Sequence, residues 1–234
     1  MRPWLRSTLI ALAALLMLPG ALAQPVRVGI VTFLSGPAAG PFGVPARNAA
    51  ELMAELLNAG SVPAPYATKG FGGNPIELVI IDEAGGTQKQ VAEFRNLAPR
   101  VDMVIGYISS GDCLGIAPVA EELKKLTVLF DCGTPRIFED ASYKYVFRTG
   151  PHATMDNVST ALYLLEKHPK VQSIAGINQN YAWGQDSWTD FEAAMKALKP
   201  GIEVKTSQMT KLFGGQFGAE ISTLMSSGAD AIHI

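Results

Sequence analysis

Short apolar runs alternate with segments of helical periodicity along most of this 234-residue chain, and this alternation limits the folds that the chain can adopt. The apolar runs, which we predict to be strands, cover residues 26–34, 76–82, 101–105, 127–130, 171–177, 202–207 and 229–234. The predicted helices cover residues 45–58, 88–97, 114–125, 153–166, 185–198 and 217–226. Strands joined by crossover helices run parallel, so the sequence predicts an α/β fold with doubly wound sheets.

Glycine, proline and polar residues mark the connections between these segments. Residues 35–43 and 135–142 are predicted to be irregular, and Thr87 is predicted to cap the helix that follows it. A break at residues 148–151 predicts two lobes joined by a hinge, with lobe 1 over residues 24–148 and the first part of lobe 2 over residues 149–234. The chain stops inside an apolar run, so we expect a C-terminally incomplete fragment in which both lobes are unfinished.

The N-terminus has the three parts of a cleavable signal peptide. Arg2 and Arg6 give a basic start, residues 9–18 are an apolar core, and Ala21-Leu22-Ala23 is a small-residue cleavage site. We predict cleavage after Ala23 and export of the remainder. The formal net charge of −2 comes without any basic block, which argues against a nucleic-acid partner.

Two polar turns at the ends of neighbouring predicted strands single out residues 106–134 as a binding region. The sequence GYISSGD follows one strand and DCGT follows the next. Parallel strands end at the same edge of a sheet, and that edge is where open α/β sheets bind ligands. The hydroxyls of Ser109 and Ser110, with free N–H groups beside a helix start, suit an anionic small ligand such as a carboxylate. Ordinary turn and cap chemistry is the alternative for the same serines.

The two cysteines lie on these same turns. In an oxidising compartment Cys113 and Cys132 could form a disulfide that joins the turns, whereas two buried thiols would be the alternative. The sequence leaves both open, because it does not give the separation of the two Cα atoms.

Signs of catalysis or metal binding are weak. The three histidines lack ligand spacing, and no glycine pattern for phosphate or dinucleotide and no nucleophile elbow is present. Asp82 and Glu83 are interpreted as a polar strand end, because neighbouring strand residues point to opposite faces. We therefore predict no catalytic residue, no metal and no cofactor.

Several stretches together resemble one known family. They are VRVGIVTFLSGPAAGPFG, GGNPIELVIIDEAG, IGYISSGDCLGIAPVAEE, VFRTGP and INQNYAWGQDSW. In order and spacing they are similar to the type I periplasmic solute-binding proteins of ABC transporters, and in particular to the branched-chain amino acid (Leu/Ile/Val) binding family. The resemblance covers residues 25–234. It implies a non-enzymatic periplasmic protein that captures a small solute between two lobes.

The resemblance also implies ligand contacts. The family's first-loop aromatic falls on Phe42, and its carboxylate-binding serine and backbone fall on Ser109, Ser110 and Gly111. Its next loop supplies a backbone carbonyl and a threonine, which fall on Cys132 and Thr134. The aromatic residues of the second lobe fall on Tyr181 and Trp183, for which plain packing is the alternative.

The turn sequences also depart from the family pattern. Asp112 lies beside the carboxylate turn, and DCGT replaces a turn of small residues, so the ligand need not be leucine or valine.

The partners implied are a small-molecule ligand (a branched-chain amino acid or a related carboxylate or amide) and the ABC permease subunits in the inner membrane. We expect a monomer. Two other functions stay open at this point. One is an extracytoplasmic ligand-sensing receptor domain of the same fold, and the other is a secreted α/β enzyme.

Overall fold

The computed structural model describes residues 24–234, so the predicted signal peptide lies outside the described residues. By their internal contacts the residues form two compact units. Among the described residues, one unit contains residues 24–26 and 54–77, and the other contains residues 27–53 and 78–234. Within the smaller unit, the Asn58 side chain donates to the carbonyl of Ile76 at 2.9 Å and accepts from its N–H at 2.8 Å. This side chain ties the end of one helix to the start of a strand.

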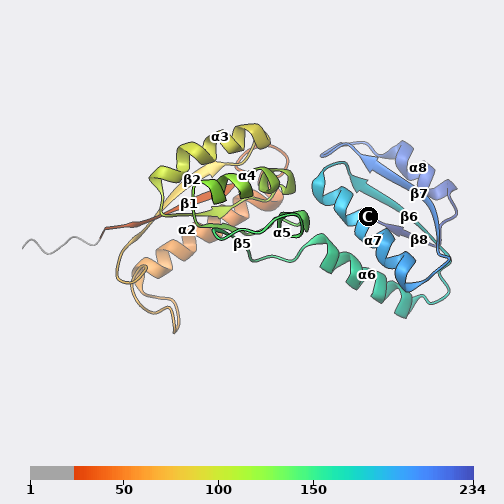
Figure 1. The fold of residues 1–234 in the computed structure, drawn as a ribbon, viewed down its shortest axis with the longest axis horizontal. Helices are drawn as coiled ribbons and strands as arrows, with labels where there is room; N and C mark the ends of the chain where they lie inside the picture. Colours follow the sequence, from red (N-terminus) through yellow and green to blue (C-terminus); the bar gives the residue numbers. More distant parts are fainter. Residues whose placement is uncertain (1–23) are drawn as a thin grey trace, which may run out of the picture. The chain divides into compact units, whose positions relative to one another are not determined.

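A five-stranded sheet has the strand order β2-β1-β3-β4-β5 (Figure 1). Its strands are β1 (Val26–Thr32), β2 (Ile76–Asp82), β3 (Met103–Gly106), β4 (Thr127–Leu129) and β5 (Val146–Arg148). The ladders β1–β3, β3–β4 and β4–β5 are parallel, as the sequence predicts. Their carboxyl ends therefore lie at one edge of the sheet.

Helical segments connect these strands. They are the π-helical turn η1 (Ala39–Gly43), α2 (Val44–Ala59), α3 (Thr87–Leu97), the 3₁₀ turn η2 (Ala98–Arg100), α4 (Ser110–Glu122) and α5 (Arg136–Glu139). Helices α3 and α4 pack side by side (Figure 1). Their apolar faces meet the sheet in a core that includes Phe94, Ile116 and Leu129, all fully buried.

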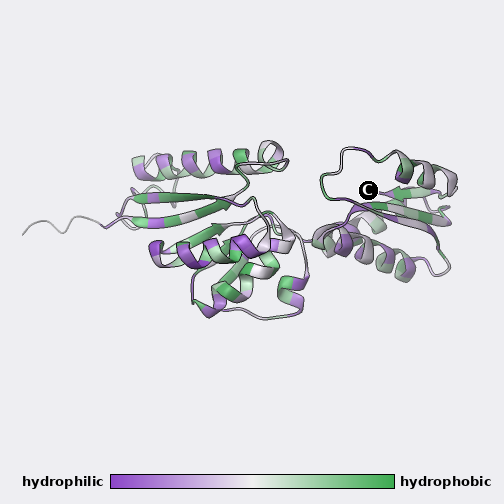
Figure 2. Ribbon diagram, turned by 90° about the horizontal axis from the view of Figure 1, so that it is seen from above, coloured by the Kyte–Doolittle hydropathy of each residue, from purple (hydrophilic) through white to green (hydrophobic). Residues whose placement is uncertain are grey.

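A second sheet has the order β7-β6-β8, and both of its ladders are parallel. Its strands are β6 (Ser173–Gln179), β7 (Glu203–Thr210) and β8 (Ala231–His233). Helices α6 (Ala153–Lys167) and α7 (Ala182–Leu198) lie on one face, and α8 (Gly218–Ser226) lies on the other (Figure 2). Trp188 and Phe191 of α7 pack with Ile174 in the core beneath them. Close packing leaves no room beside Gly176, where an added Cβ would lie 2.3 Å from the Trp188 ring.

The predicted α/β class is confirmed, and so are most elements, but four local predictions are wrong. Helix α4 begins at Ser110 instead of Leu114, because the Ser109 hydroxyl accepts the N–H of Asp112 and so caps an earlier start. The segments predicted as irregular contain η1 and α5. Thr87 is the first residue of α3 and not its cap, and the cap position belongs to Gly86.

Candidate functional site

A pocket of about 330 Å³ opens where the strands of both sheets end. Its lining includes Phe33 after β1, Ile108 after β3, Asp131 after β4, Gln179 at the end of β6 and Leu212 after β7. The remaining lining residues are Ala38, Phe42, Ser109, Ser110, Gly133, Pro151, Asp156, Tyr181, Trp183 and Phe213. The carboxyl edge chosen from the sequence is therefore where the structure has this pocket.

The first wall of the pocket is the turn between β3 and α4. Tyr107 occupies the left-handed region at φ 71° and is fully buried, which turns the chain sharply after the strand. Ser109 is the N-cap residue, so Ser110 and Gly111 are the first two residues of α4. The first N–H groups of a helix have no partner within it, and they carry its partial positive charge. This wall therefore offers N–H groups and hydroxyls to a negatively charged ligand group.

Glu83 lies directly beneath this turn. Its Oε1 accepts the N–H of Ile108 at 2.9 Å and the N–H of Ser109 at 2.7 Å, and its Oε2 lies 3.0 Å from the Ile108 nitrogen. Burial raises the pKa of Glu83 to about 8, although these two N–H donors act in the opposite direction. Two N–H groups of the turn therefore donate to a carboxyl group whose protonated form is favoured by burial.

Asp112 is buried and contacts the start of α3. Its Oδ1 accepts the Thr87 hydroxyl at 2.7 Å, which links the starts of α3 and α4. Burial raises its pKa, while the bonds from Thr87 and Ser109 lower it. Asp112 does not line the pocket, so its conflict with an anionic ligand is smaller than its sequence position suggests.

The second wall is the turn after β4, which a disulfide joins to α4. Cys113 and Cys132 are bonded, with their Cα atoms 6.2 Å apart and both side chains fully buried. Arg148 Nη1 donates to the carbonyls of Cys132 at 3.2 Å and of Thr134 at 2.6 Å. Gly133, between them, is the residue that faces the pocket.

Asp186 of α7 binds this second turn. Its Oδ2 accepts the Thr134 hydroxyl at 2.6 Å, and its Oδ1 lies 3.0 Å from Nε of Arg136. The Thr134 hydroxyl, which the family resemblance assigns to the ligand, is thus occupied by a carboxylate in this structure. Thr134 is fully buried and does not line the pocket.

Aromatic side chains form the rest of the wall. The Trp183 ring lies against Gly133, where an added Cβ would be 2.3 Å from Cδ1 of the indole. Tyr181 and Trp183 are neighbours, with ring centroids 6.4 Å apart. Phe42 is 49% exposed and Trp183 is 37% exposed, so each presents apolar surface that a ligand can cover.

Two acidic residues also line the pocket. Partial burial of its carboxyl raises the pKa of Asp131. Burial, and then the charge of Asp131, raise the pKa of Tyr181 to about 12, so the phenol remains a hydrogen-bond donor. Asp156 comes from the first turn of α6. Asp131 also acts through its charge on Glu83, which lies beneath the turn before α4.

The structure brings together five of the residues predicted to bind ligand: Phe42, Ser109, Ser110, Tyr181 and Trp183. Gly111, Cys132 and Thr134 are next to lining residues and do not line the pocket themselves. Asp131 and Gln179 lie in two quoted stretches, DCGT and INQNYAWGQDSW, but were not predicted to contact the ligand, and Asp156 and Phe213 carry no motif. Glu83 was interpreted as part of a polar strand end, although a carboxylate directly after the apolar strand β2 was a signal that could have identified it.

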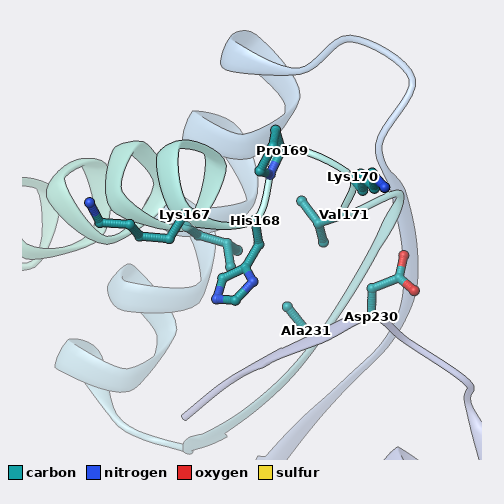
Figure 3. A pocket seen from close by; sticks show the side chains of 8 residues that line it. Lys167, His168, Pro169, Lys170, Val171, Asp230 and Ala231 are labelled. Carbon is teal, nitrogen blue, oxygen red and sulfur yellow. The ribbon is translucent and has the colours of Figure 1, made fainter.

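A second, more open pocket of about 600 Å³ lies where α6 leads into β6, beside the start of β8 (Figure 3). Val171 and Ala231 give it apolar surface, and charged side chains stand around them (Figure 3). Lys167 pairs with Glu166 at 2.6 Å, and Asp230 accepts the N–H groups of Gln172 and Ser173 at 2.7 and 3.0 Å. Lys167 and Asp230 are therefore engaged within the protein.

Between residues 24 and 234, no group of three or more His, Cys, Asp or Glu side chains is arranged to hold a metal ion. No helix in that same range is long and apolar enough to cross a membrane.

Comparison with known proteins places the chain in a family. The family model described as periplasmic binding protein matches residues 25–234. The chain belongs to the periplasmic binding protein family. A search of curated proteins finds no match.

Solved structures share the fold at low sequence identity. A solute-binding protein of an ABC transporter from R. palustris, in complex with 4-hydroxybenzoate, is 22% identical with a TM-score of 0.74, covering 90% of this chain and 54% of that one. The leucine-binding protein LivK of Thermotoga maritima is 20% identical with a TM-score of 0.74, covering 88% and 55%. A fatty acid ABC transporter substrate-binding protein from Thermomonospora curvata is 22% identical with a TM-score of 0.73, covering 92% and 51%. The chain thus spans about half the length of these proteins.

Proposed function

We propose that this protein is the periplasmic substrate-binding component of an ABC importer, and that it captures a small carboxylate-bearing solute and delivers it to the permease. The observation that carries the proposal is the composition of the pocket at the strand ends. One wall offers the N–H groups and hydroxyls at the start of α4, and the other offers Phe42, Tyr181 and Trp183. The anionic group of a ligand would bind the N–H groups and hydroxyls, and its apolar body would pack against the aromatic rings.

The aromatic wall favours a ligand with a flat or bulky apolar body. Phe33 and Phe213 add two more rings to the three already named, which is more aromatic surface than a small aliphatic side chain can cover. We infer that aromatic carboxylates are better candidates than leucine, isoleucine or valine. The bound 4-hydroxybenzoate of the R. palustris relative supports this inference only by analogy.

The second candidate is a ligand-sensing receptor domain, which would use the same pocket and report the ligand instead of delivering it. The occupied Thr134 hydroxyl favours neither role. Reconstitution with the cognate permease separates the two, because only an importer component makes solute uptake depend on the protein.

Isothermal titration against a panel of aromatic carboxylates, amino acids, fatty acids and amides tests the proposal. We expect at least one carboxylate to bind with a dissociation constant in the micromolar range. Trp183→Ala should weaken that ligand by about 10-fold or more, because stacking on the indole contributes about 0.5–1.5 kcal/mol in addition to the apolar area that the ring buries. Tyr163→Ala is the control, since Tyr163 is 63% exposed on α6 and outside the pocket. Absence of binding by every carboxylate would refute the proposal.

Two substitutions at Ser110 separate the roles of its hydroxyl and its N–H. Proline suits the first position of a helix, and Ser109 before it has φ −67° and ψ 118°, which is compatible with a following proline. Ser110→Pro therefore removes the N–H while retaining the helix start. We expect Ser110→Pro to weaken carboxylate binding by at least 10-fold and Ser110→Ala to weaken it less. Equal affinities for Ser110→Pro and wild type would remove the helix N–H from the site.

A further inference from the structure

Glu83 combines two properties that the proposed carboxylate site does not by itself require. It is 0% exposed, and its carboxyl binds two consecutive N–H groups of the turn that lines the pocket. Those N–H groups belong to Ile108 and Ser109, and the next two along the chain belong to Ser110 and Gly111. Four consecutive N–H groups are thus divided between a carboxyl of the protein and the position where a ligand anion would bind.

The groups around Glu83 are acidic or neutral. Asp112 of α4 and Asp131 after β4 act on Glu83 through their charges, and Tyr107 of the turn is itself affected by Glu83. The backbone contact from β1 is the carbonyl of Thr32, which accepts the Glu83 N–H at 2.9 Å. The charges of Asp112 and Asp131 both disfavour the ionised form of the Glu83 carboxyl. An added ligand carboxylate would therefore meet an environment that already disfavours negative charge.

We propose that Glu83 is a positioning residue for the turn between β3 and α4. It takes up a proton when an anionic ligand group binds to the neighbouring N–H groups of Ser110 and Gly111. The proposal rests on the proposed carboxylate-binding function. Two carboxylates bound to neighbouring donors repel each other, and this repulsion raises the pKa of one of them, which then holds a proton. The exposed ligand loses less by staying ionised, which leaves the proton on the buried Glu83.

The neutral carboxyl still holds the turn. Its Oε1 accepts both N–H groups, and Oε2, which shares the Ile108 N–H at 3.0 Å, retains an acceptor lone pair when it carries a proton. With a pKa of about 8, Glu83 is mainly protonated at pH 7 and mainly ionised at pH 9. An anionic ligand that binds only the protonated form then loses about 10-fold in affinity between these two pH values.

Two variants separate positioning from proton uptake. Glu83→Gln keeps an oxygen that accepts both N–H groups but does not titrate, and Glu83→Ala removes the acceptor. Glu55→Gln is the control, because Glu55 is exposed on α2. Two measurements need no ligand. The first is hydrogen exchange at Ile108 and Ser109, and the second is the thermal stability of wild type and Glu83→Gln from pH 5 to pH 9.

We expect exchange at Ile108 and Ser109 to be at least 10-fold faster in Glu83→Ala than in wild type, and near wild type in Glu83→Gln and Glu55→Gln. The folded pKa is raised above the ordinary value of 4.5, so ionisation opposes folding. The stability of wild type relative to Glu83→Gln should therefore fall as the pH rises toward and through 8. Unchanged exchange in Glu83→Ala, or a stability difference that does not depend on pH, would overturn the proposal.

Titration with benzoate tests the link to ligand binding, because its carboxylate remains ionised throughout this range. In wild type we expect about 10-fold weaker binding at pH 9 than at pH 7, with proton uptake on binding at pH 8.5. Glu83→Gln should bind with a nearly constant affinity. Equal pH dependence in the two proteins would refute proton coupling. Failure of every carboxylate to bind would refute the proposed function instead, and the ligand-free measurements would still decide the role of Glu83.

Discussion

Removing the disulfide that joins α4 to the turn after β4 should lower the free energy of unfolding. The size of the loss depends on the number of residues between the two cysteines. Cys113 and Cys132 are 19 residues apart, and closing a loop of that size restricts the unfolded chain by about 3 kcal/mol. We expect the double substitution Cys113→Ala and Cys132→Ala to lower the free energy of unfolding by about this amount. The removed sulfur atoms are fully buried, so lost packing adds to the effect.

Urea unfolding followed by circular dichroism measures this change. With an m value of about 2 kcal/mol per molar urea, a loss of about 3 kcal/mol shifts the midpoint by about 1.5 M. Reduction of the wild type with dithiothreitol should reproduce most of the shift, whereas the double variant should not respond to the reductant. Equal midpoints for oxidised wild type and the double variant would show that the cross-link does not stabilise the fold.

Two further predictions concern positions away from the pocket. Gly176→Ala should cost about 1–3 kcal/mol, because its Cβ would lie 2.3 Å from the buried Trp188 ring. Gly218→Ala, which meets no atom within 4 Å, is the matched control, and equal melting temperatures for the two variants would contradict this account of the packing. Bonds from Gln172 and Ser173 lower the pKa of Asp230 below 3.8, so its stabilising effect is present above pH 3.8 and is lost as the pH falls through the lower folded value. The melting temperatures of wild type and Asp230→Asn should accordingly differ by a constant amount from pH 5 to pH 7 and converge in acid, and a difference that persists in acid would refute the assignment.

Elements with an uninterrupted apolar pattern were predicted best from the sequence. The predicted strand 76–82 and β2 have the same bounds, and the predicted helix 45–58 differs from α2 by one residue at each end. The start of α4 was missed because Gly111 and Asp112 are poor helix formers, and their effect is offset by the cap at Ser109. Capping was the alternative interpretation of this serine in the sequence, and the structure confirms it.

The site was predicted in part for a similar reason. Side chains that project from strand ends, such as Ser109, were accessible to an argument from topology and resemblance. The alternation of strand faces led to the interpretation of Asp82 and Glu83 as a polar strand end, but Glu83 follows the last residue of β2 and is fully buried. Its burial depends on β1 and on the turn after β3, which are distant in the sequence. Likewise, the engagement of Thr134 by Asp186 joins residues 52 positions apart.

The bonds made by Asp186 have a consequence for how the pocket is assembled. Asp186 lies one helical turn before Asp190 and three residues after Trp183, so the carboxylate that binds Thr134 and Arg136 belongs to the same helical end as the indole against Gly133. The turn after β4 and the indole of Trp183 are therefore held together before any ligand enters. A ligand does not have to order these two surfaces when it binds. Because no conformational entropy is lost in ordering them, contacts with the ligand contribute more fully to affinity and selectivity.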